Sequence, residues 1–270
     1  MQNTKINSQI ISIPNERTSS KKKTGILYGK LYEPCDGLRH PAVILSHGYN
    51  GSFTDFNDDC YFFAKNGFVA FAYDFAGGSV RSNSSGKTTD MTLQTEKQDL
   101  LTVIDYIRGL ENVYENKLFL LGGSQGGLVT ALVADERPEL ISAVSLYFPA
   151  FCIPDDWRKQ YPDGTKIPKM LDFWGLRLGS GFIEDAIALD LETSIGKYSG
   201  PVLIIHGTND NIVPLSYAQE AEKKYSDARL VTLTGEGHGF SPAGAVQARK
   251  LVLEHMRQVL KKDGQVTAVN

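Results

Sequence analysis

Long apolar runs, paired cysteines and an excess of one charge are all missing from this 270-residue sequence. No apolar run approaches the roughly 20 residues that span a bilayer, and no secretory signal is recognisable, so no membrane association is expected. The three cysteines are an odd number at scattered spacings, which is typical of reduced thiols in a cytoplasmic protein and not of a disulfide framework. A formal net charge of -3 provides no basic patch for nucleic acid.

The sequence does contain enough apolar residues for a packed core, with 41% hydrophobic and 22% charged residues. This composition and length fit one large α/β domain with an insertion better than two separate domains. The domain is expected to span residues 1–270. The composition leaves the oligomeric state open.

Short apolar runs alternate with helix-like stretches along most of the chain. This alternation predicts an α/β fold with a mostly parallel central sheet flanked by helices. Two earlier segments, Ile10–Ile13 and Ile26–Tyr32, mix apolar and polar residues as half-exposed antiparallel strands do. The expected buried strands are Ala42–Ser46, Phe68–Tyr73, Lys117–Leu121, Ala143–Tyr147, Val202–Ile205 and Leu230–Thr234, and the expected helices are Asp55–Asn66, Leu93–Gly109, Gln125–Ala134, Ser216–Tyr225 and Ala243–Leu260.

The alternation breaks between residues 150 and 198, where prolines, glycines and aromatic residues are frequent. A structureless loop of that length is rare inside a compact domain, so we expect residues 150–198 to form a small, mostly helical cap. The cap is expected to cover the substrate pocket, with Asp155, Asp156, Trp157 and Trp174 binding the substrate. The alternative for each aromatic residue is that it belongs to the cap's own core.

Four glycines surround Ser124 in the stretch LFLLGGSQGGL, at the junction of a predicted strand and a predicted helix. Glycine inside a strand or helix costs about 0.5–1 kcal/mol relative to alanine. Four glycines together therefore indicate a backbone geometry that larger residues cannot adopt. Gly122, Ser124 and Gly126 match the G-x-S-x-G pattern of a sharp strand-to-helix turn that exposes a nucleophilic serine. The alternative is a glycine-rich turn with an incidental serine.

A serine nucleophile needs a base oriented by a carboxylate, and the sequence offers His238 and Asp210. Both residues follow predicted strands, so both are expected at the carboxyl edge of the sheet, together with Ser124. Asp185 and Asp190 are expected to be surface charges. His206 ends a predicted strand and is expected to cap it.

The oxyanion of a tetrahedral intermediate needs two N–H donors. One is expected from the backbone of Gln125, directly after the serine. The other is expected from the backbone of Tyr49, in the glycine-lined turn after strand Ala42–Ser46, with His47 in a structural role.

With these motifs in place, the sequence resembles the α/β-hydrolase superfamily over essentially the whole chain. Within it, the sequence is similar to bacterial esterases of the cinnamoyl/feruloyl type and to dipeptidyl-peptidase-like relatives. The resemblance implies a serine carboxylesterase that forms an acyl-enzyme with a small ester, with an aromatic acyl group as a candidate. One departure lies in the cap: where those esterases place a tyrosine that binds the substrate phenol, this sequence reads Gly181-Phe182-Ile183.

Two other functions compete with ester hydrolysis: a peptidase or other acyl hydrolase, and a non-catalytic small-molecule-binding protein on the same fold. Neither a metal nor another cofactor is expected. No two histidines stand four residues apart, and Ser124 replaces the second glycine of a dinucleotide-binding G-x-G-x-x-G pattern. The expected partner is therefore a small-molecule ester alone.

Overall fold

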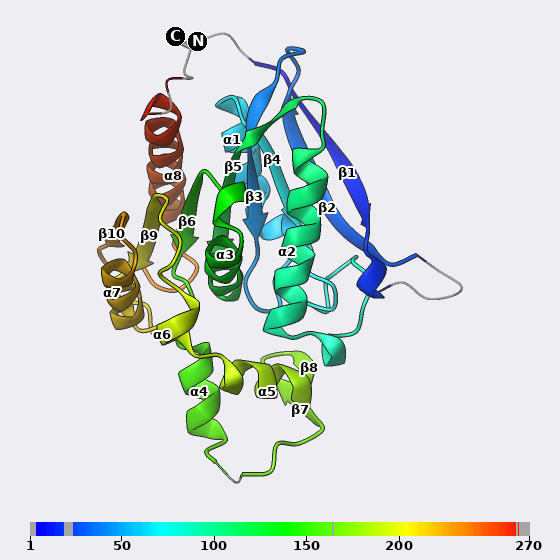
Figure 1. The fold of residues 1–270 in the computed structure, drawn as a ribbon, viewed down its shortest axis with the longest axis vertical. Coiled ribbons are helices and arrows are strands. Elements are labelled where there is room, and N and C mark those ends of the chain that lie inside the picture. Colours follow the sequence, from blue (N-terminus) through cyan, green and yellow to red (C-terminus); the bar gives the residue numbers. More distant parts are fainter. Residues whose placement is uncertain (1–3, 19–23, 164, 263, 265–270) are drawn as a thin grey trace.

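A mostly parallel sheet of eight strands forms the centre of the protein (Figure 1). A computed structural model describes residues 4–18, 24–163, 165–262 and 264. The strands follow the order β1-β2-β4-β3-β5-β6-β9-β10, in which β2 pairs antiparallel with β1 and β4 and the remaining pairs are parallel. Their bounds are Ile6–Pro14 (β1), Ile26–Pro34 (β2), His40–Ser46 (β3), Val69–Tyr73 (β4), Val113–Gly123 (β5), Ala143–Tyr147 (β6), Val202–Gly207 (β9) and Ala228–Leu233 (β10).

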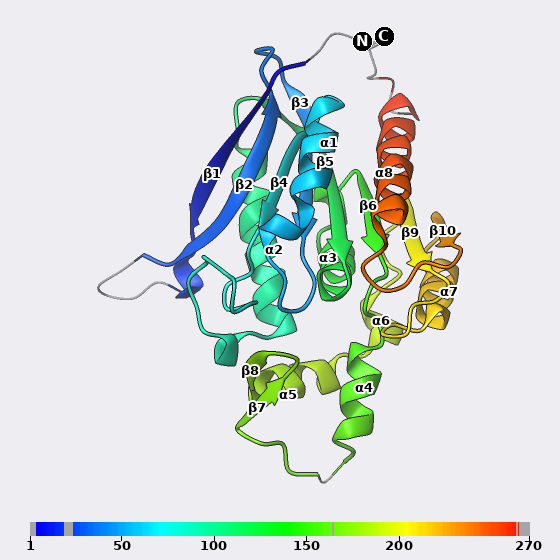
Figure 2. The same cartoon turned by 180° about the vertical axis from the view of Figure 1, so that it is seen from behind.

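Helices cover both faces of this sheet (Figures 1 and 2). α2, α3 and α7 pack on one face in the larger apolar core, and α1 and α8 pack on the other. The predicted α/β fold is therefore confirmed. No helix in the described part of the chain combines the length and apolar character of a membrane span. The bounds are Asn57–Lys65 (α1), Leu93–Arg108 (α2), Gln125–Glu136 (α3), Leu215–Lys224 (α7) and Pro242–Lys262 (α8), with short 3-10 turns at Glu16–Thr18, Phe53–Phe56, Thr88–Asp90 and Pro138–Leu140.

The segment between β6 and β9 lies beside the carboxyl ends of the parallel strands (Figures 1 and 2). It contains three helices, α4 (Ile153–Gln160), α5 (Ser180–Ala188) and α6 (Leu191–Ser194). It also contains a β-hairpin that the sequence prediction missed, formed by β7 (Met170–Phe173) and β8 (Leu176–Gly179).

The hairpin was missed because its turn carries an unusual residue. Trp174 and Gly175 both have positive φ, 41° and 82°, as a two-residue type I′ turn requires. Glycine adopts such a φ readily, but tryptophan rarely does, so Trp174 gave no turn signal. The consequence is that Trp174 stands at an exposed tip.

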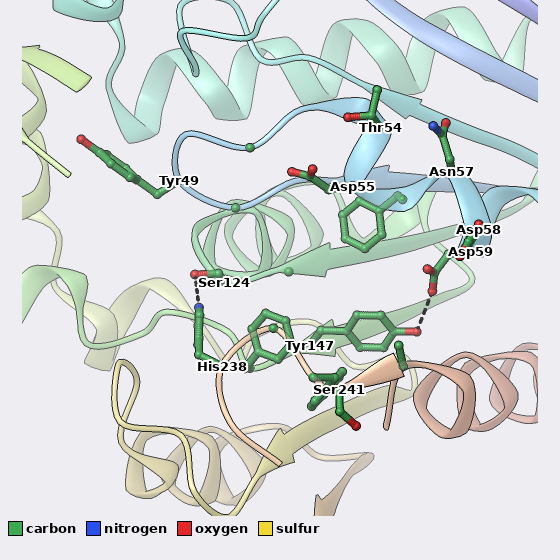
Figure 3. A pocket seen from close by; sticks show the side chains of 18 of the residues that line it. Tyr49, Thr54, Asp55, Asn57, Asp58, Asp59, Ser124, Tyr147, His238 and Ser241 are labelled. Carbon is green, nitrogen blue, oxygen red and sulfur yellow. Dashed lines mark hydrogen bonds between the residues drawn. The ribbon is translucent and has the colours of Figure 1, made fainter. Parts of the chain in front are cut away.

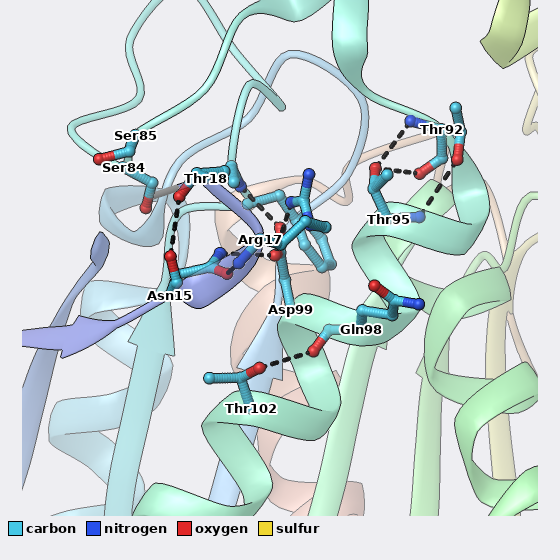
Figure 4. Close-up of polar contacts among 12 residues, drawn as sticks. Asn15, Arg17, Thr18, Ser84, Ser85, Thr92, Thr95, Gln98, Asp99 and Thr102 are labelled. Carbon is cyan, nitrogen blue, oxygen red and sulfur yellow. Dashed lines mark hydrogen bonds and ion pairs between the residues drawn. The ribbon is translucent and has the colours of Figure 1, made fainter. Parts of the chain in front are cut away.

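A buried carboxylate ties the antiparallel edge of the sheet to α2 (Figure 4). Asp99 accepts hydrogen bonds from Asn15 Nδ2 at 3.0 Å, from Arg17 Nη2 at 2.7 Å and from the Ala76 N–H at 2.8 Å. Its side chain is 1% exposed. These three donors come from the end of β1, from the turn after it and from the segment after β4, so Asp99 fixes their relative positions.

We predict that Asp99→Ala lowers the free energy of unfolding by about 3 kcal/mol, because three donors lose a buried charged acceptor. Asp105→Ala, at an exposed position of the same helix, is the matched control. The measurement is urea unfolding followed by circular dichroism. Equal midpoints for the two variants would contradict this role for Asp99.

Candidate active site

Ser124 occupies a strained position between β5 and α3. Its φ of 53° and ψ of -121° lie outside the regions that a serine ordinarily adopts. A Cβ at Gly122 would collide with the carbonyl oxygen of Gly126, and a Cβ at Gly126 would collide with the carbonyl oxygens of Ser46 and His47. The glycines are therefore required by the close approach of β3, β5 and α3, and this approach holds the serine at the tip of the turn.

The structure brings together the three residues that the sequence analysis selected, and Figure 3 shows the contact between Ser124 and His238. His238 Nε2 lies 3.0 Å from Ser124 Oγ, and His238 Nδ1 lies 2.8 Å from Asp210 Oδ2. Ser124 follows β5, Asp210 follows β9 and His238 follows β10. Because these strands are parallel, their carboxyl ends meet at one edge of the sheet, which closes a contact between residues 114 positions apart.

Asp210 is held as a fully hydrogen-bonded carboxylate. Its Oδ1 accepts the N–H groups of Ile212 and Val213, each at 2.9 Å. Its Oδ2 faces His238 and, at 3.3 Å, His206 Nε2. Burial acts to raise the pKa of Asp210, but the hydrogen bonds from Val213, His238 and Ile212 outweigh it and the pKa is lowered. The carboxylate is therefore ionised and can orient the His238 imidazole.

His206 supports Asp210, a role that the sequence analysis did not foresee. Burial lowers the pKa of His206, so its ring is neutral. Its Nε2 lies 3.0 Å from the Val213 carbonyl and 3.3 Å from the Asp210 carboxylate, two groups that only accept, so Nε2 carries the proton. The available signal was the spacing of four residues between His206 and Asp210.

The two expected oxyanion donors are close to Ser124: Gln125 follows it directly, and Tyr49 follows Gly48, where an added Cβ would lie 3.0 Å from the Ser124 Cβ. Among the described residues, the N–H groups of Tyr49 and Gln125 donate to no other backbone group. The turn that carries Tyr49 is fixed by the buried His47, whose Nε2 accepts the Phe75 N–H at 3.1 Å and whose Nδ1 therefore donates to the Gly48 carbonyl at 2.7 Å. This geometry gives His47 the structural role expected for it.

A buried glutamate fixes the other donor residue. Gln125 Nε2 donates to Glu96 Oε2 at 2.8 Å, and both residues are at most 2% exposed. Burial raises the pKa of Glu96 to about 8, an effect that the hydrogen bond from Gln125 only partly offsets. Glu96 is therefore protonated at neutral pH, and α2 holds the first residue of α3 without a buried charge.

A pocket of about 990 Å³ opens at Ser124 and His238. Of the four expected substrate-binding residues, Trp174 lines it, whereas the structure places Asp155, Asp156 and Trp157 elsewhere. Asp155 pairs with Arg158 and accepts from the Tyr217 hydroxyl, and Trp157 is buried in the cap against Tyr161, Phe173 and Phe182. Trp157 and Phe182 belong to the larger apolar core, together with the buried cap residues Leu176, Leu178 and Ile183, so the cap packs onto the domain through them.

The sheet, the helices and the position of Ser124 define an α/β-hydrolase fold. The model of the prolyl oligopeptidase family matches residues 54–263, so the chain belongs to this family. The protein is a hydrolase with esterases among its relatives.

Two relatives and one solved structure illustrate this kinship. The bifunctional esterase/perhydrolase DCH of Acinetobacter calcoaceticus is 25% identical over 80% of this chain and 92% of its own length. The putative carbamate hydrolase RutD of Pseudomonas savastanoi pv. phaseolicola is 23% identical over 82% of this chain and 96% of its own. The structure of Est1E from Butyrivibrio proteoclasticus superposes with a TM-score of 0.77 at 25% identity, over 93% of this chain and 99% of its own; a second structure of Est1E contains ferulic acid.

We predict that Glu96→Gln makes the protein more stable relative to wild type as the pH rises. The folded chain binds the Glu96 proton more tightly than the unfolded chain, so the stabilising contribution of Glu96 is complete below its usual pKa of 4.5 and is lost as pH rises through about 8. Glutamine keeps the acceptor for Gln125 and does not titrate. The check is urea unfolding of both proteins from pH 5 to pH 9, with the exposed Glu184→Gln as control; parallel pH profiles for Glu96→Gln and wild type would contradict it.

Proposed function

We propose that the protein is a serine-dependent carboxylic ester hydrolase that acts through an acyl-enzyme on a small ester, with aromatic esters as the preferred candidates. The observation that carries this proposal is the unbroken hydrogen-bonded series from Ser124 Oγ through His238 to Asp210. The esterases among the relatives support the same chemistry.

In the first step, His238 Nε2 accepts the Ser124 proton as Oγ attacks the ester carbonyl carbon. The carbonyl oxygen becomes an oxyanion, stabilised by the N–H groups of Tyr49 and Gln125 and by the positive end of α3. Collapse of this intermediate expels the alkoxide, which takes the proton from His238. Water then attacks the acyl-enzyme by the same route, releasing the acid and restoring Ser124.

A peptidase is the second candidate, and the family match is the observation that favours it. The same residues would act, with an amine as the leaving group. A matched ester and amide with one acyl group separate the two candidates by their kcat/KM values. The third reading, a non-catalytic binding protein, predicts no labelling of Ser124 by a fluorophosphonate.

Residues 150–198 act in this proposal as a cap within a single domain of residues 1–270. Among the described residues of the cap, Trp174 lines the pocket, and its ring packs against Tyr49 at 6.4 Å between centroids. Tyr49 also donates its hydroxyl to the Phe173 carbonyl at 2.7 Å. The cap therefore holds the side chain of the residue that we assign as an oxyanion donor.

We predict that Ser124→Ala lowers kcat/KM for p-nitrophenyl acetate by at least about four orders of magnitude, because the three residues act as a unit. The variant also loses labelling by a fluorophosphonate, in which Oγ displaces fluoride from phosphorus. Ser226→Ala, at an exposed position, is the control and retains both. Wild-type turnover by a folded Ser124→Ala protein would refute the assignment.

Asp210→Asn is expected to lower kcat by about three to four orders of magnitude. If the amide oxygen keeps the Ile212 and Val213 N–H groups, the NH2 group faces His238 Nδ1, which must then accept, so His238 Nε2 carries a proton and cannot accept the one from Ser124. Steady-state kinetics and thermal unfolding are measured beside Asp227→Asn, whose side chain is exposed. Full activity of Asp210→Asn would show that another carboxylate orients His238.

A further inference from the structure

The pocket continues beyond Ser124 toward the N-terminal ends of α1 and α8, and Tyr147 runs along this extension (Figure 3). The Tyr147 carbonyl accepts the Ser124 N–H at 3.0 Å, and the Tyr147 hydroxyl donates to Asp59 Oδ1 at 3.3 Å. The length of one tyrosine side chain therefore separates the serine from Asp59. A ligand whose ester group lies at Ser124 and whose other end reaches Asp59 therefore has about one aromatic ring between these two ends.

Asp59 and Arg249 form an ion pair with one long contact, at the end of the pocket away from Ser124. Arg249 Nη2 lies 3.3 Å from Asp59 Oδ2, and the two side chains are 14% and 8% exposed. Arg249 Nε is buried and has no hydrogen-bond partner within the described residues. Burial raises the pKa of Asp59 to about 6 in spite of the nearby guanidinium. Nε itself is covered, so the capacity left for a ligand lies in the exposed part of the guanidinium, for which one side-chain hydrogen bond, to Asp59, is made among the described residues.

Aromatic side chains form the wall between the two ends. The Phe148 ring lies 4.5 Å from the His238 ring and 4.7 Å from the Phe240 ring. The Tyr147 ring lies 5.5 Å from Phe240 and 6.4 Å from Phe56. Such a wall offers a further aromatic ring edge-to-face or offset contacts, so it favours an aryl group over a flexible chain.

The charges around the pocket favour a neutral group at its far end. Asp55, Asp58, Asp59, Arg81 and Arg249 all line the pocket, and Arg81 already pairs with Asp55 at 3.0 Å. An anionic group beside Arg249 would also meet the Asp59 carboxylate, and a hydrocarbon tip would leave both partners as they are. A hydroxyl satisfies both, because it accepts from Arg249 and donates to Asp59 at the same time.

We propose that Asp59, Arg249 and Tyr147 form a subsite for a hydroxyl group carried on an aryl ring of the ester substrate. The proposal rests on the proposed ester hydrolysis and adds a specificity element to it. The subsite lies on α1, α8 and β6, whereas the sequence analysis sought the substrate's polar partners in the cap. The aryl ring belongs either to the acyl group or to the alcohol, and the experiment separates the two.

Two pairs of esters test this subsite. Methyl 3-(4-hydroxyphenyl)propanoate and methyl 3-phenylpropanoate place the ring in the acyl group, and 4-hydroxyphenethyl acetate and phenethyl acetate place it in the alcohol. A saturated spacer separates ring and ester in all four, so the hydroxyl has little electronic effect on the carbonyl. We expect kcat/KM to favour the hydroxylated ester of one pair by about tenfold, the worth of one net hydrogen bond.

The informative variant is the double substitution Asp59→Leu with Arg249→Met. Removing both partners leaves no unpaired buried charge, so it is tolerated better than either single change. The double variant is expected to lose the preference for the hydroxylated ester while still hydrolysing the plain ester. Arg257→Met, at an exposed position of α8, is the control and keeps the preference. Tyr147→Phe, which keeps the ring, is expected to reduce the preference in part.

Binding to the Ser124→Ala protein, measured by calorimetry with the same four esters, separates failure of the subsite from failure of the proposed function. If wild type hydrolyses none of the esters but Ser124→Ala binds one hydroxylated ester more tightly, and the double substitution removes that difference, the subsite stands and ester hydrolysis does not. If both methods show no preference in either pair, or the double variant keeps it, the subsite is overturned.

Discussion

The close approach of three backbone segments at Ser124 is the constraint on which the rest of the site depends. The turns after β3 and β5 and the first turn of α3 meet where a Cβ at Gly122 or Gly126 would overlap main-chain atoms. At this point Ser124 has a φ of 53°. The same spacing places Gly48 against the Ser124 side chain, with a Cβ at Gly48 lying 3.0 Å from the serine Cβ. The nucleophile and the turn that carries Tyr49 are therefore positioned by one packing arrangement.

Buried polar groups around this point are arranged so that each key residue has one available orientation. Asp210 is surrounded by donors, which leave His238 Nδ1 as a donor and Nε2 free to face Ser124. His47 is fixed by the Phe75 N–H, and Gln125 is fixed by Glu96. Buried polar groups are costly when left unpaired, so such networks restrict the site more tightly than apolar packing does. The strain at Ser124 is held by this surrounding structure.

The two ends of the pocket differ in the polar groups that they offer to a substrate. On the cap side, the aromatic rings of Trp157, Phe173 and Phe182 pack against one another or against Tyr49, and they leave Trp174 as the cap's contribution to the lining. On the other side, the pocket continues along Tyr147 to Asp59 and Arg249. The fold therefore offers a substrate more polar contacts at the sheet and its helices than at the cap.

The α/β fold and the residues at Ser124 could be predicted from the amino-acid sequence, because both depend on local signals. Apolar runs mark strands buried on both faces, and glycines around a serine mark a turn that larger residues cannot make. The grouping of Ser124, Asp210 and His238 could also be predicted, because each residue follows a strand whose carboxyl end lies at the same edge of the sheet.

Which other residues lie at that edge could be learned only from the folded chain. The contacts of His206 with Asp210, of Glu96 with Gln125 and of Asp59 with Arg249 join distant segments or depend on a side chain's direction, and neither is encoded in local periodicity. The same limit applied to the cap, where composition could not separate a pocket-lining tryptophan from a core one. Trp157 is buried and Trp174 is exposed. This difference depends on how the whole segment folds.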